Sequence, residues 1–280
     1  MPEKTCIVIT GPTAVGKTDY AIELALQHNT QIISADSRQC YKELNIGVAK
    51  PPVEQLQKVH HSFIGSHSIH DEVTVKTFEQ YALRSLEKIF EINDTAILVG
   101  GTGLYIKAFC EGLDDVPATD ESIRKKINER YQIEGMPWLR KEIETKDLLF
   151  FREGEMQNPQ RMMRALGVKL TTGRSILDFH TGKRIARNFN IQKIHLDIPR
   201  DELYQRINRR VDVMMLQGLL KEAEQLFPYR NLNALQTVGY KELFDFIDGK
   251  ISLDQAIDEI KKNTRHFAKR QITWFKKYNL

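Results

Sequence analysis

A chain of 280 residues is long enough for one large domain, or for one domain that carries an insertion, with a sizeable core. Its 41% hydrophobic and 28% charged residues are typical of a globular protein, and no apolar run is long enough to span a membrane. Three scattered cysteines form neither a disulfide framework nor a zinc pattern. Because the first strand begins almost at the N-terminus, we expect no signal or transit peptide and a cytoplasmic protein.

The most specific motif lies near the N-terminus, where residues 11–18 read GPTAVGKT and match G-x-x-x-x-G-K-[ST]. A β-branched run at 6–10 precedes the motif, and apolar residues at helical spacing follow it at 19–26. In such a loop, backbone N–H groups surround an anion, the lysine adds a cation, and the threonine hydroxyl is placed for Mg²⁺. The sequence therefore predicts a site for a di- or triphosphate, with Thr18 on Mg²⁺, made by Gly11, Pro12, Thr13, Ala14, Val15, Gly16, Lys17 and Thr18.

A second predicted parallel strand, at 31–36, ends in the carboxylate of Asp36, and Ser37, Arg38 and Gln39 follow on the next loop. In a doubly wound α/β fold, the carboxyl ends of the strands converge on the ligand crevice. We therefore expect Asp36 near the phosphates. The alternative is an aspartate that only caps the next turn.

Four histidines at positions 60, 61, 67 and 70 precede a predicted helix at 77–92. They lack a cysteine or acidic partner at ligand spacing, so a metal site there is disfavoured. A third buried strand at 95–99 then runs into GGTGLY at 100–105, with Thr102 among the glycines. A mechanical ATPase would often have an acidic residue at this point. Its absence leaves a small-molecule kinase or another transferase that releases phosphate.

From residue 115 to about 191 the β-branched runs give way to charged amphipathic helices, including 120–131, 136–144 and one that starts at 158. These patterns predict an α/β core at 1–114, a helical insertion domain at 115–191, and completion of the core at 192–280. The expected fold is a P-loop NTPase-like parallel sheet flanked by helices.

The last part of the core begins with a predicted strand at 193–198 and a helix at 200–218, in which Arg210 either reaches the phosphate pocket or faces solvent. A tight turn at 237–242 leads into another helix. The tail at 269–278 interleaves basic and aromatic residues, which suits a nucleic acid, although its rings could simply dock the last helix.

Charge is unevenly distributed although the net charge is only +4. Residues 161–188 contain seven Lys/Arg against one acid, and residues 261–280 contain seven against none. Either run alone is best explained as a solvated face. Two of them in a phosphate-binding protein favour a polyanionic partner.

Taken together, eight segments resemble the tRNA dimethylallyltransferase (tRNA isopentenyltransferase) family in order along nearly the whole chain. They are GPTAVGKT at 11–18, SADSRQCY at 34–41, IGVAKP at 46–51, VGGTGLY at 99–105, QRMMRALGV at 160–168, RRVDVMMLQG at 209–218, TVGYKEL at 237–243 and AKRQITWF at 268–275. Val48 departs from the family, which usually has threonine there.

The resemblance implies transfer of a dimethylallyl group from dimethylallyl diphosphate to N6 of adenosine 37, beside the anticodon of tRNA. The P-loop would then hold the leaving pyrophosphate with Lys17, Mg²⁺ and Arg210, which matches the family's diphosphate-contacting arginine. The exocyclic amine of adenine is a poor nucleophile, so Asp36 is the candidate general base.

The resemblance also implies the partner, the anticodon stem-loop of tRNA, whose target base leaves its stack. Its contacts, carried over by motif position, include segments 237–241 and 269–274. We expect a monomer. The alternatives are a small-molecule or nucleoside kinase and a non-enzymatic nucleic-acid-binding module with a vestigial P-loop. The principal predicted tRNA contacts are Asp36, Ser37, Arg38, Gln39, Thr102, Arg124, Gln160, Arg161, Met162, Met163 and Arg164.

Overall fold

The computed structural model describes residues 4–280, which fall into two compact units. The core unit joins the chain up to Gly112 with Ala186–Leu280, and the inserted unit is Leu113–Ile185. The return to the core thus comes earlier than the expected residue 191. The reason is that Arg187 already donates hydrogen bonds to the carbonyls of Phe109 and Ala108, at 2.8 and 2.7 Å, before the next strand begins.

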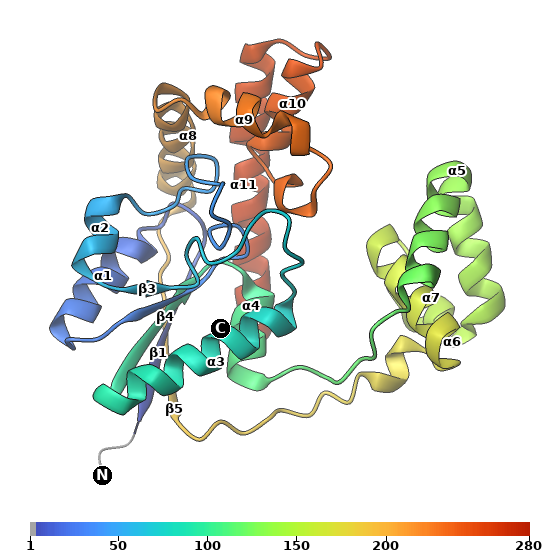
Figure 1. Cartoon of the computed structure of the whole chain (residues 1–280), viewed down its shortest axis with the longest axis horizontal. Coiled ribbons are helices and arrows are strands. Elements are labelled where there is room, and N and C mark those ends of the chain that lie inside the picture. The colour runs from blue at the N-terminus through green and yellow to red at the C-terminus, as the bar shows by residue number, and fades with distance from the viewer. Residues whose placement is uncertain (1–3) are drawn as a thin grey trace. The chain divides into compact units, whose positions relative to one another are not determined.

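Within the described residues, the core unit is built on one five-stranded parallel sheet in the order β3-β2-β4-β1-β5 (Figure 1). This arrangement confirms the predicted parallel α/β fold. The strands are β1 (Thr5–Thr10), β2 (Ile32–Ala35), β3 (His61–Ser62), β4 (Thr95–Gly100) and β5 (Asn190–His195).

Helices cover both faces of the sheet, as the apolar runs of its strands require. Alternate side chains of β1 point in opposite directions: Ile7 and Ile9 pack with the α1 side chains, whereas Cys6 and Val8 face the larger core that includes α3, α4 and α11. The helices of this unit are α1 (Lys17–Gln27), α2 (Val53–Lys58), α3 (Val75–Ile92), α4 (Gly103–Glu111), α8 (Arg200–Leu216), α9 (Leu219–Leu226), α10 (Tyr240–Ile247) and α11 (Leu253–Tyr278), with short 3₁₀ turns at Phe227–Tyr229 and Asn233–Leu235.

Strand β5 is the one predicted strand whose position was wrong. The alternating apolar residues favoured 193–198, but pairing with β1 sets its bounds, from Thr5 opposite Asn190 to Thr10 opposite His195. Leu196 continues the register for one more hydrogen bond, from its N–H to the carbonyl of Thr10 at 2.9 Å. The backbone ladder therefore decides the strand, while the apolar side chains beyond it still pack on the core.

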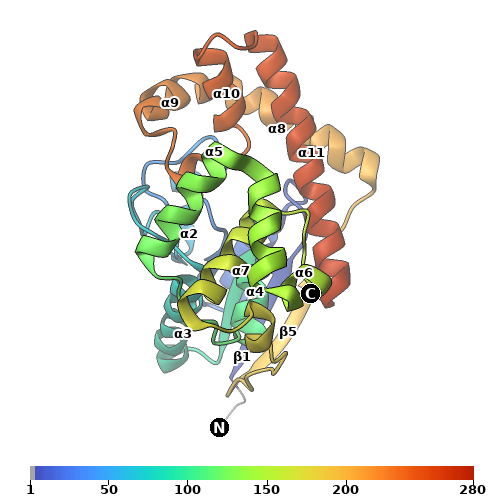
Figure 2. The same ribbon diagram turned by 90° about the vertical axis from the view of Figure 1, so that its right-hand side faces the viewer.

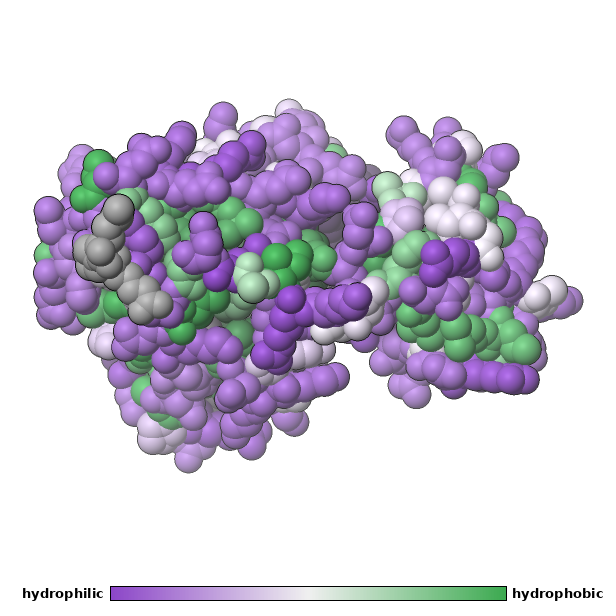
Figure 3. All heavy atoms as spheres, turned by 90° about the horizontal axis from the view of Figure 1, so that it is seen from below, coloured by the Kyte–Doolittle hydropathy of each residue, from purple (hydrophilic) through white to green (hydrophobic). Residues whose placement is uncertain are grey.

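The last four helices gather beyond the carboxyl end of the sheet, where α8, α9 and α10 lie together and α11 runs back alongside α4 (Figures 1 and 2). They bring segments from late in the chain to the ends of β1, β2 and β4. On the face drawn in Figure 3, polar residues cover most of the surface and apolar ones form separate patches. No helix among residues 4–280 combines the length and apolarity that crossing a membrane requires.

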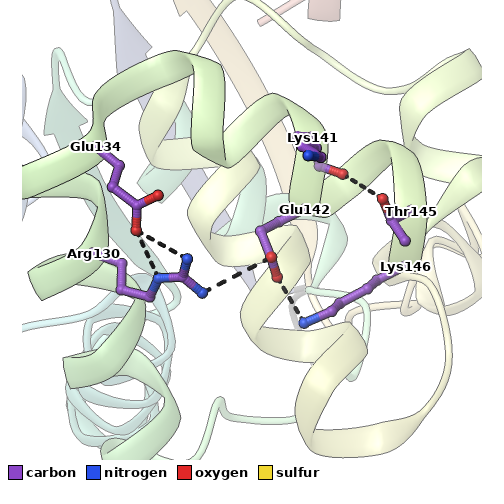
Figure 4. Close-up of polar contacts among 6 residues, drawn as sticks. All are labelled: Arg130, Glu134, Lys141, Glu142, Thr145 and Lys146. Carbon is purple, nitrogen blue, oxygen red and sulfur yellow. Dashed lines mark hydrogen bonds and ion pairs between the residues drawn. The ribbon is translucent and has the colours of Figure 1, made fainter.

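The inserted unit is entirely helical where it is regular, with its own apolar core around Trp138, Leu139 and Leu166. Its longest helix bends sharply at Gly135, whose φ is 67°. Arg130 bridges the bend, with ion pairs to Glu134 at 2.9 Å and to Glu142 at 3.9 Å (Figure 4). The elements of the unit are α5 (Glu121–Lys146), α6 (Leu148–Glu153), α7 (Pro159–Thr172) and a 3₁₀ turn at Ile176–Phe179.

Candidate active site

The predicted phosphate loop connects β1 to α1 at the carboxyl end of the sheet. Gly11, Ala14 and Gly16 have φ values of 144°, 67° and 105°, which let a short loop curl back on itself. A side chain at Gly11 would lie 2.5 Å from the carbonyl oxygen of Leu196, so only glycine fits against the neighbouring strand end. Helix α1 begins directly after the loop at Lys17, and its positive end faces the same space.

Two cationic side chains meet at this loop. Lys17 Nζ donates to the carbonyl of Pro12 at 2.7 Å, and Arg210 Nη1, from α8, donates to the hydroxyl of Thr13 at 3.3 Å. Burial lowers the pKa of Lys17 to about 7, although the charge of Asp36 opposes the shift, and burial also lowers the pKa of Arg210. Because desolvated cations gain most from an opposite charge, the pair favours an anionic ligand. Arg210 therefore reaches the phosphate loop rather than solvent.

Asp36 follows β2 and lies in the same pocket as the phosphate loop. Its Oδ1 accepts the N–H groups of Arg38 at 2.8 Å and Gln39 at 3.2 Å. The aspartate thus caps the next turn as well as facing the ligand space, so the two predicted roles coexist. Thr102 joins this loop, since its hydroxyl oxygen accepts the N–H of Ser37 at 3.0 Å.

Gln271 is a buried residue of α11 that links two loops of the site; the sequence placed it only within the predicted tRNA-contacting segment 269–274, and its role in the pocket was not predicted. Its Oε1 accepts the N–H of Thr13 at 2.8 Å, and its Nε2 donates to the carbonyl of Gly101 at 2.9 Å. The side chain therefore links the phosphate loop to the glycine turn after β4. The signal available in the sequence was an uncharged polar residue inside the basic and aromatic tail.

These groups line one pocket of the core unit, with a volume of about 780 Å³ including its open mouth. The polar part of the lining includes Lys17, Thr18, Asp36, Arg210 and Gln271. A ligand with an anionic end and a short apolar end matches this mixed lining. The apolar part of the lining consists of Val48, Ala49, Pro51, Ile64, Val99 and Phe267.

Comparison with known proteins agrees with this site. The family model described as IPP (isopentenyl pyrophosphate) transferase matches residues 39–278. A protein of Christiangramia forsetii named tRNA dimethylallyltransferase is 48% identical over 97% of this chain and 90% of its own length. The chain belongs to the IPP transferase family. The resemblance indicated by the sequence motifs is therefore confirmed, and the kinase and vestigial-module alternatives do not fit this family of transferases.

Solved structures place the fold in the same group. The full-length tRNA isopentenylpyrophosphate transferase of Bacillus halodurans is 36% identical, with a TM-score of 0.70 over 98% of this chain and 87% of that one. A eukaryotic dimethylallyltransferase acting on tRNA is 26% identical, with a TM-score of 0.80 over 97% and 70% of the two chains. The IPP transferase fold therefore accounts for both units.

The donor set at the phosphate loop suits Mg²⁺. Thr18 stands in the first turn of α1 and lines the pocket, and one hydroxyl together with phosphate oxygens and water is the oxygen-rich set that this ion prefers. Elsewhere in residues 4–280, no group of three or more His, Cys, Asp or Glu side chains is placed to hold a metal. Of the four neighbouring histidines, His61 lines the pocket.

The predicted tRNA contacts of the inserted unit lie on α5 and α7. Arg124, Gln160, Arg161 and Arg164 all have exposed surface. Partial burial of the Arg164 guanidinium, and to a lesser extent the charge of Arg124, lowers the pKa of Arg164. Met163 is half-buried. Met162 is fully buried in the core of the unit, so its side chain is not available to a partner, and the prediction for it is wrong.

Two aromatic side chains in or next to the predicted tRNA-contacting segments of the core unit face inward. Tyr240, in the segment 237–241, is fully buried, and Phe275, which directly follows the segment 269–274, is 2% exposed. The aromatic rings of the tail therefore pack the last helix against the core, which is the second of the two alternatives. Arg38, on the loop after Asp36, donates to the carbonyl of Asn233 at 2.8 Å and so ties this loop to the late helices.

Proposed function

We propose that this chain transfers the dimethylallyl group of dimethylallyl diphosphate to N6 of adenosine 37 in the anticodon loop of tRNA, with release of pyrophosphate. The observation that carries the proposal is the pocket of the core unit, which joins a phosphate loop to an apolar wall and a carboxylate. The named activities of its relatives support it.

The phosphate end of the pocket would make the donor a good electrophile. As the allylic C–O bond breaks, negative charge builds on the diphosphate, and Lys17, Arg210 and the loop amides meet it in a partly desolvated site. Mg²⁺, when held by Thr18 and the diphosphate, would neutralise further charge. The anion would also restore the proton of Lys17, whose pKa the pocket lowers to about 7.

Asp36 would act as the general base for the nucleophile, which is the N6 amine of adenosine. A bond forms between N6 and the allylic carbon, and one proton must leave the nitrogen. The carboxylate is held in place through Oδ1 by the N–H groups of Arg38 and Gln39. A carboxylate fixed within the same pocket as the phosphate loop would take that proton.

The acceptor would use both units. In the core unit, Asp36 and Gln39 line the pocket, and Thr102 is hydrogen-bonded to the same loop through the N–H of Ser37; a base that has left its stack would meet this loop. On the inserted unit, exposed Arg124, Arg161 and Arg164 offer cations for phosphates of the stem.

The test is incubation of the purified chain with Mg²⁺, dimethylallyl diphosphate, ATP and an unmodified anticodon stem-loop. We expect prenylated adenosine and pyrophosphate, and no phosphoryl transfer from ATP. The matched control is the same stem-loop with guanosine at position 37, which lacks the N6 amine and should remain unmodified. Phosphoryl transfer in place of prenyl transfer, or RNA binding without reaction, would contradict the proposal.

A further inference from the structure

Part of the apolar lining of the pocket comes from a short irregular loop, residues 45–50, which we call the wall loop. Val48 and Ala49 of this loop line the pocket. Ala49 has a φ of 49°, a left-handed conformation that costs a non-glycine residue energy unless its surroundings impose it. The wall loop therefore depends on contacts outside itself for its shape.

One of those contacts is the carboxylate of Glu222, in the first turn of α9. Its Oε2 accepts the N–H of Ile46 at 2.9 Å, and its Oε1 accepts the N–H of Gly47 at 2.9 Å and the hydroxyl of Tyr240 at 2.6 Å. Hydrogen bonds to an ionised acceptor are about twice as strong as neutral ones. Glu222 itself is partly buried and is not part of the pocket lining.

Tyr240 forms the surface on which the wall loop rests. Its side chain is fully buried, and a Cβ on Gly47 would lie 2.6 Å from its ring. The loop backbone thus lies directly against the ring at that glycine. Burial and the charge of Glu222 both raise the pKa of Tyr240 far above its ordinary value, which keeps the hydroxyl a donor to the carboxylate.

The wall loop is also hydrogen-bonded to the loop that contains Asp36 and Gln39. Gln39 Nε2 donates to the carbonyls of Val48 at 3.2 Å and Ala49 at 2.9 Å, while the backbone N–H of Gln39 donates to Asp36. Lys50 Nζ closes the loop by donating to the carbonyl of Tyr41 at 2.8 Å. A displacement of the wall loop would therefore change both the pocket width and the support of Asp36.

We propose that Glu222 is a positioning residue that fixes the wall loop and so makes the pocket select a dimethylallyl chain over longer allylic chains. The inference rests on the proposed function. A pocket rejects a longer chain only as far as its wall resists displacement. Here two backbone N–H groups of the wall loop donate to the carboxylate of Glu222, and the hydroxyl of Tyr240 holds that carboxylate with a third hydrogen bond.

The test compares Glu222→Gln with Tyr240→Phe and with the control Glu224→Gln, an exposed position on the same helix. A glutamine keeps the volume of the side chain but has only one acceptor oxygen, so its amide N–H₂ would face a backbone donor. The ratio of kcat/KM for dimethylallyl diphosphate to that for geranyl diphosphate is measured with one stem-loop. We expect Glu222→Gln to lower this ratio about tenfold, through KM for the donor, and Tyr240→Phe to lower it less.

A second measurement separates this inference from the proposed function. Calorimetric binding of the unreactive thiodiphosphate analogues of the same two donors needs no turnover. Loss of selective binding in Glu222→Gln, with KM for the RNA unchanged, supports the inference. An unchanged ratio in both Glu222→Gln and Tyr240→Phe would overturn it, as would an equal loss in Glu224→Gln. If the protein without any substitution bound the two analogues selectively but transferred no prenyl group, the result would count against the proposed function alone.

Discussion

The pocket of the core unit and the exposed part of α7 in the inserted unit hold their charged side chains in different ways. In the core unit, the pocket residues Lys17, Asp36 and Arg210 each have a protein partner: the carbonyl of Pro12, the N–H of Arg38 and the hydroxyl of Thr13. The last of these contacts joins segments far apart in the sequence. In the inserted unit, Arg161 stands exposed with only a distant ion pair to Glu155 at 3.9 Å. The first arrangement suits chemistry on a small ligand, which needs fixed geometry, and the second suits attraction of a polyanion.

The difference teaches where a substitution should act. A change in the core pocket should affect the turnover rate or the binding of the donor and leave the affinity for RNA unchanged. A change on the inserted unit should lower the affinity for RNA and leave turnover unchanged. This expectation holds only for side chains that are exposed. Met162 lies beside exposed arginines of the inserted unit, but it is fully buried and packs in the core of that unit.

The strongest test of this division is Asp36→Asn. The asparagine oxygen can still accept the N–H groups of Arg38 and Gln39, so the turn is kept while the general base is lost. We expect kcat to fall by about 10²–10⁴-fold, with the affinity for the stem-loop and the thermal midpoint unchanged. Single-turnover prenyl transfer measures the rate. Normal turnover would remove Asp36 from the role of base.

A pH-dependent effect should distinguish Lys17 from the surface lysines. Its pKa, lowered to about 7, means that above this pH the lysine of the free protein has lost its proton, whereas bound pyrophosphate would restore it. Binding should therefore take up a proton, and affinity should fall by up to about tenfold per pH unit as the pH rises above that value.

Calorimetry of pyrophosphate binding in two buffers of different ionisation enthalpy measures the proton uptake. Lys17→Met is the control, because it removes the lysine term and leaves the titration of pyrophosphate itself. If the variant and the unmodified chain took up the same number of protons, Lys17 would not be the group that titrates.

Much of the fold and of the pocket could be predicted from the sequence, because these features depend on local sequence patterns. Short segments contain the signals for the phosphate loop and for Asp36 at a strand end. They also contain the change from β-branched runs to charged amphipathic helices near residue 115. Gln271 and Glu222 could not be found in this way. Each acts on a loop more than 170 residues away in the chain, so only the folded structure shows what its side chain contacts.

A smaller effect should separate the two arginines of α7, which the sequence treats alike. Arg161→Gln should lower the salt dependence of stem-loop binding by about 0.7–0.9 in log–log slope, the loss of one phosphate contact, without changing stability. Arg164 also donates to Thr119 at 3.2 Å and to the carbonyl of Pro117 at 3.2 Å. Arg164→Gln should therefore lower stability as well, by about 1 kcal/mol. Equal thermal midpoints for the two variants would show that these contacts of Arg164 contribute nothing.

The smallest expected effect is at Val48, where the family usually has threonine. Val48 lines the apolar side of the pocket, and Val48→Thr replaces one methyl group with a hydroxyl. A buried methyl contributes about 0.8 kcal/mol, so KM for dimethylallyl diphosphate should rise by no more than about fourfold. Because Val48 belongs to the apolar lining that we assign to the donor, and the wall loop is held through its backbone, kcat and RNA affinity should stay unchanged.

Val53→Thr is the matched control for this prediction, since Val53 begins α2 and is 64% exposed. Steady-state kinetics with the donor varied at saturating stem-loop separates KM from kcat. A rise in KM at position 48 and none at position 53 would place the apolar end of the donor against the wall loop. If instead Val48→Thr changed only the KM for the stem-loop, the wall loop would face the RNA, and the division of the pocket between donor and acceptor would have to be reversed.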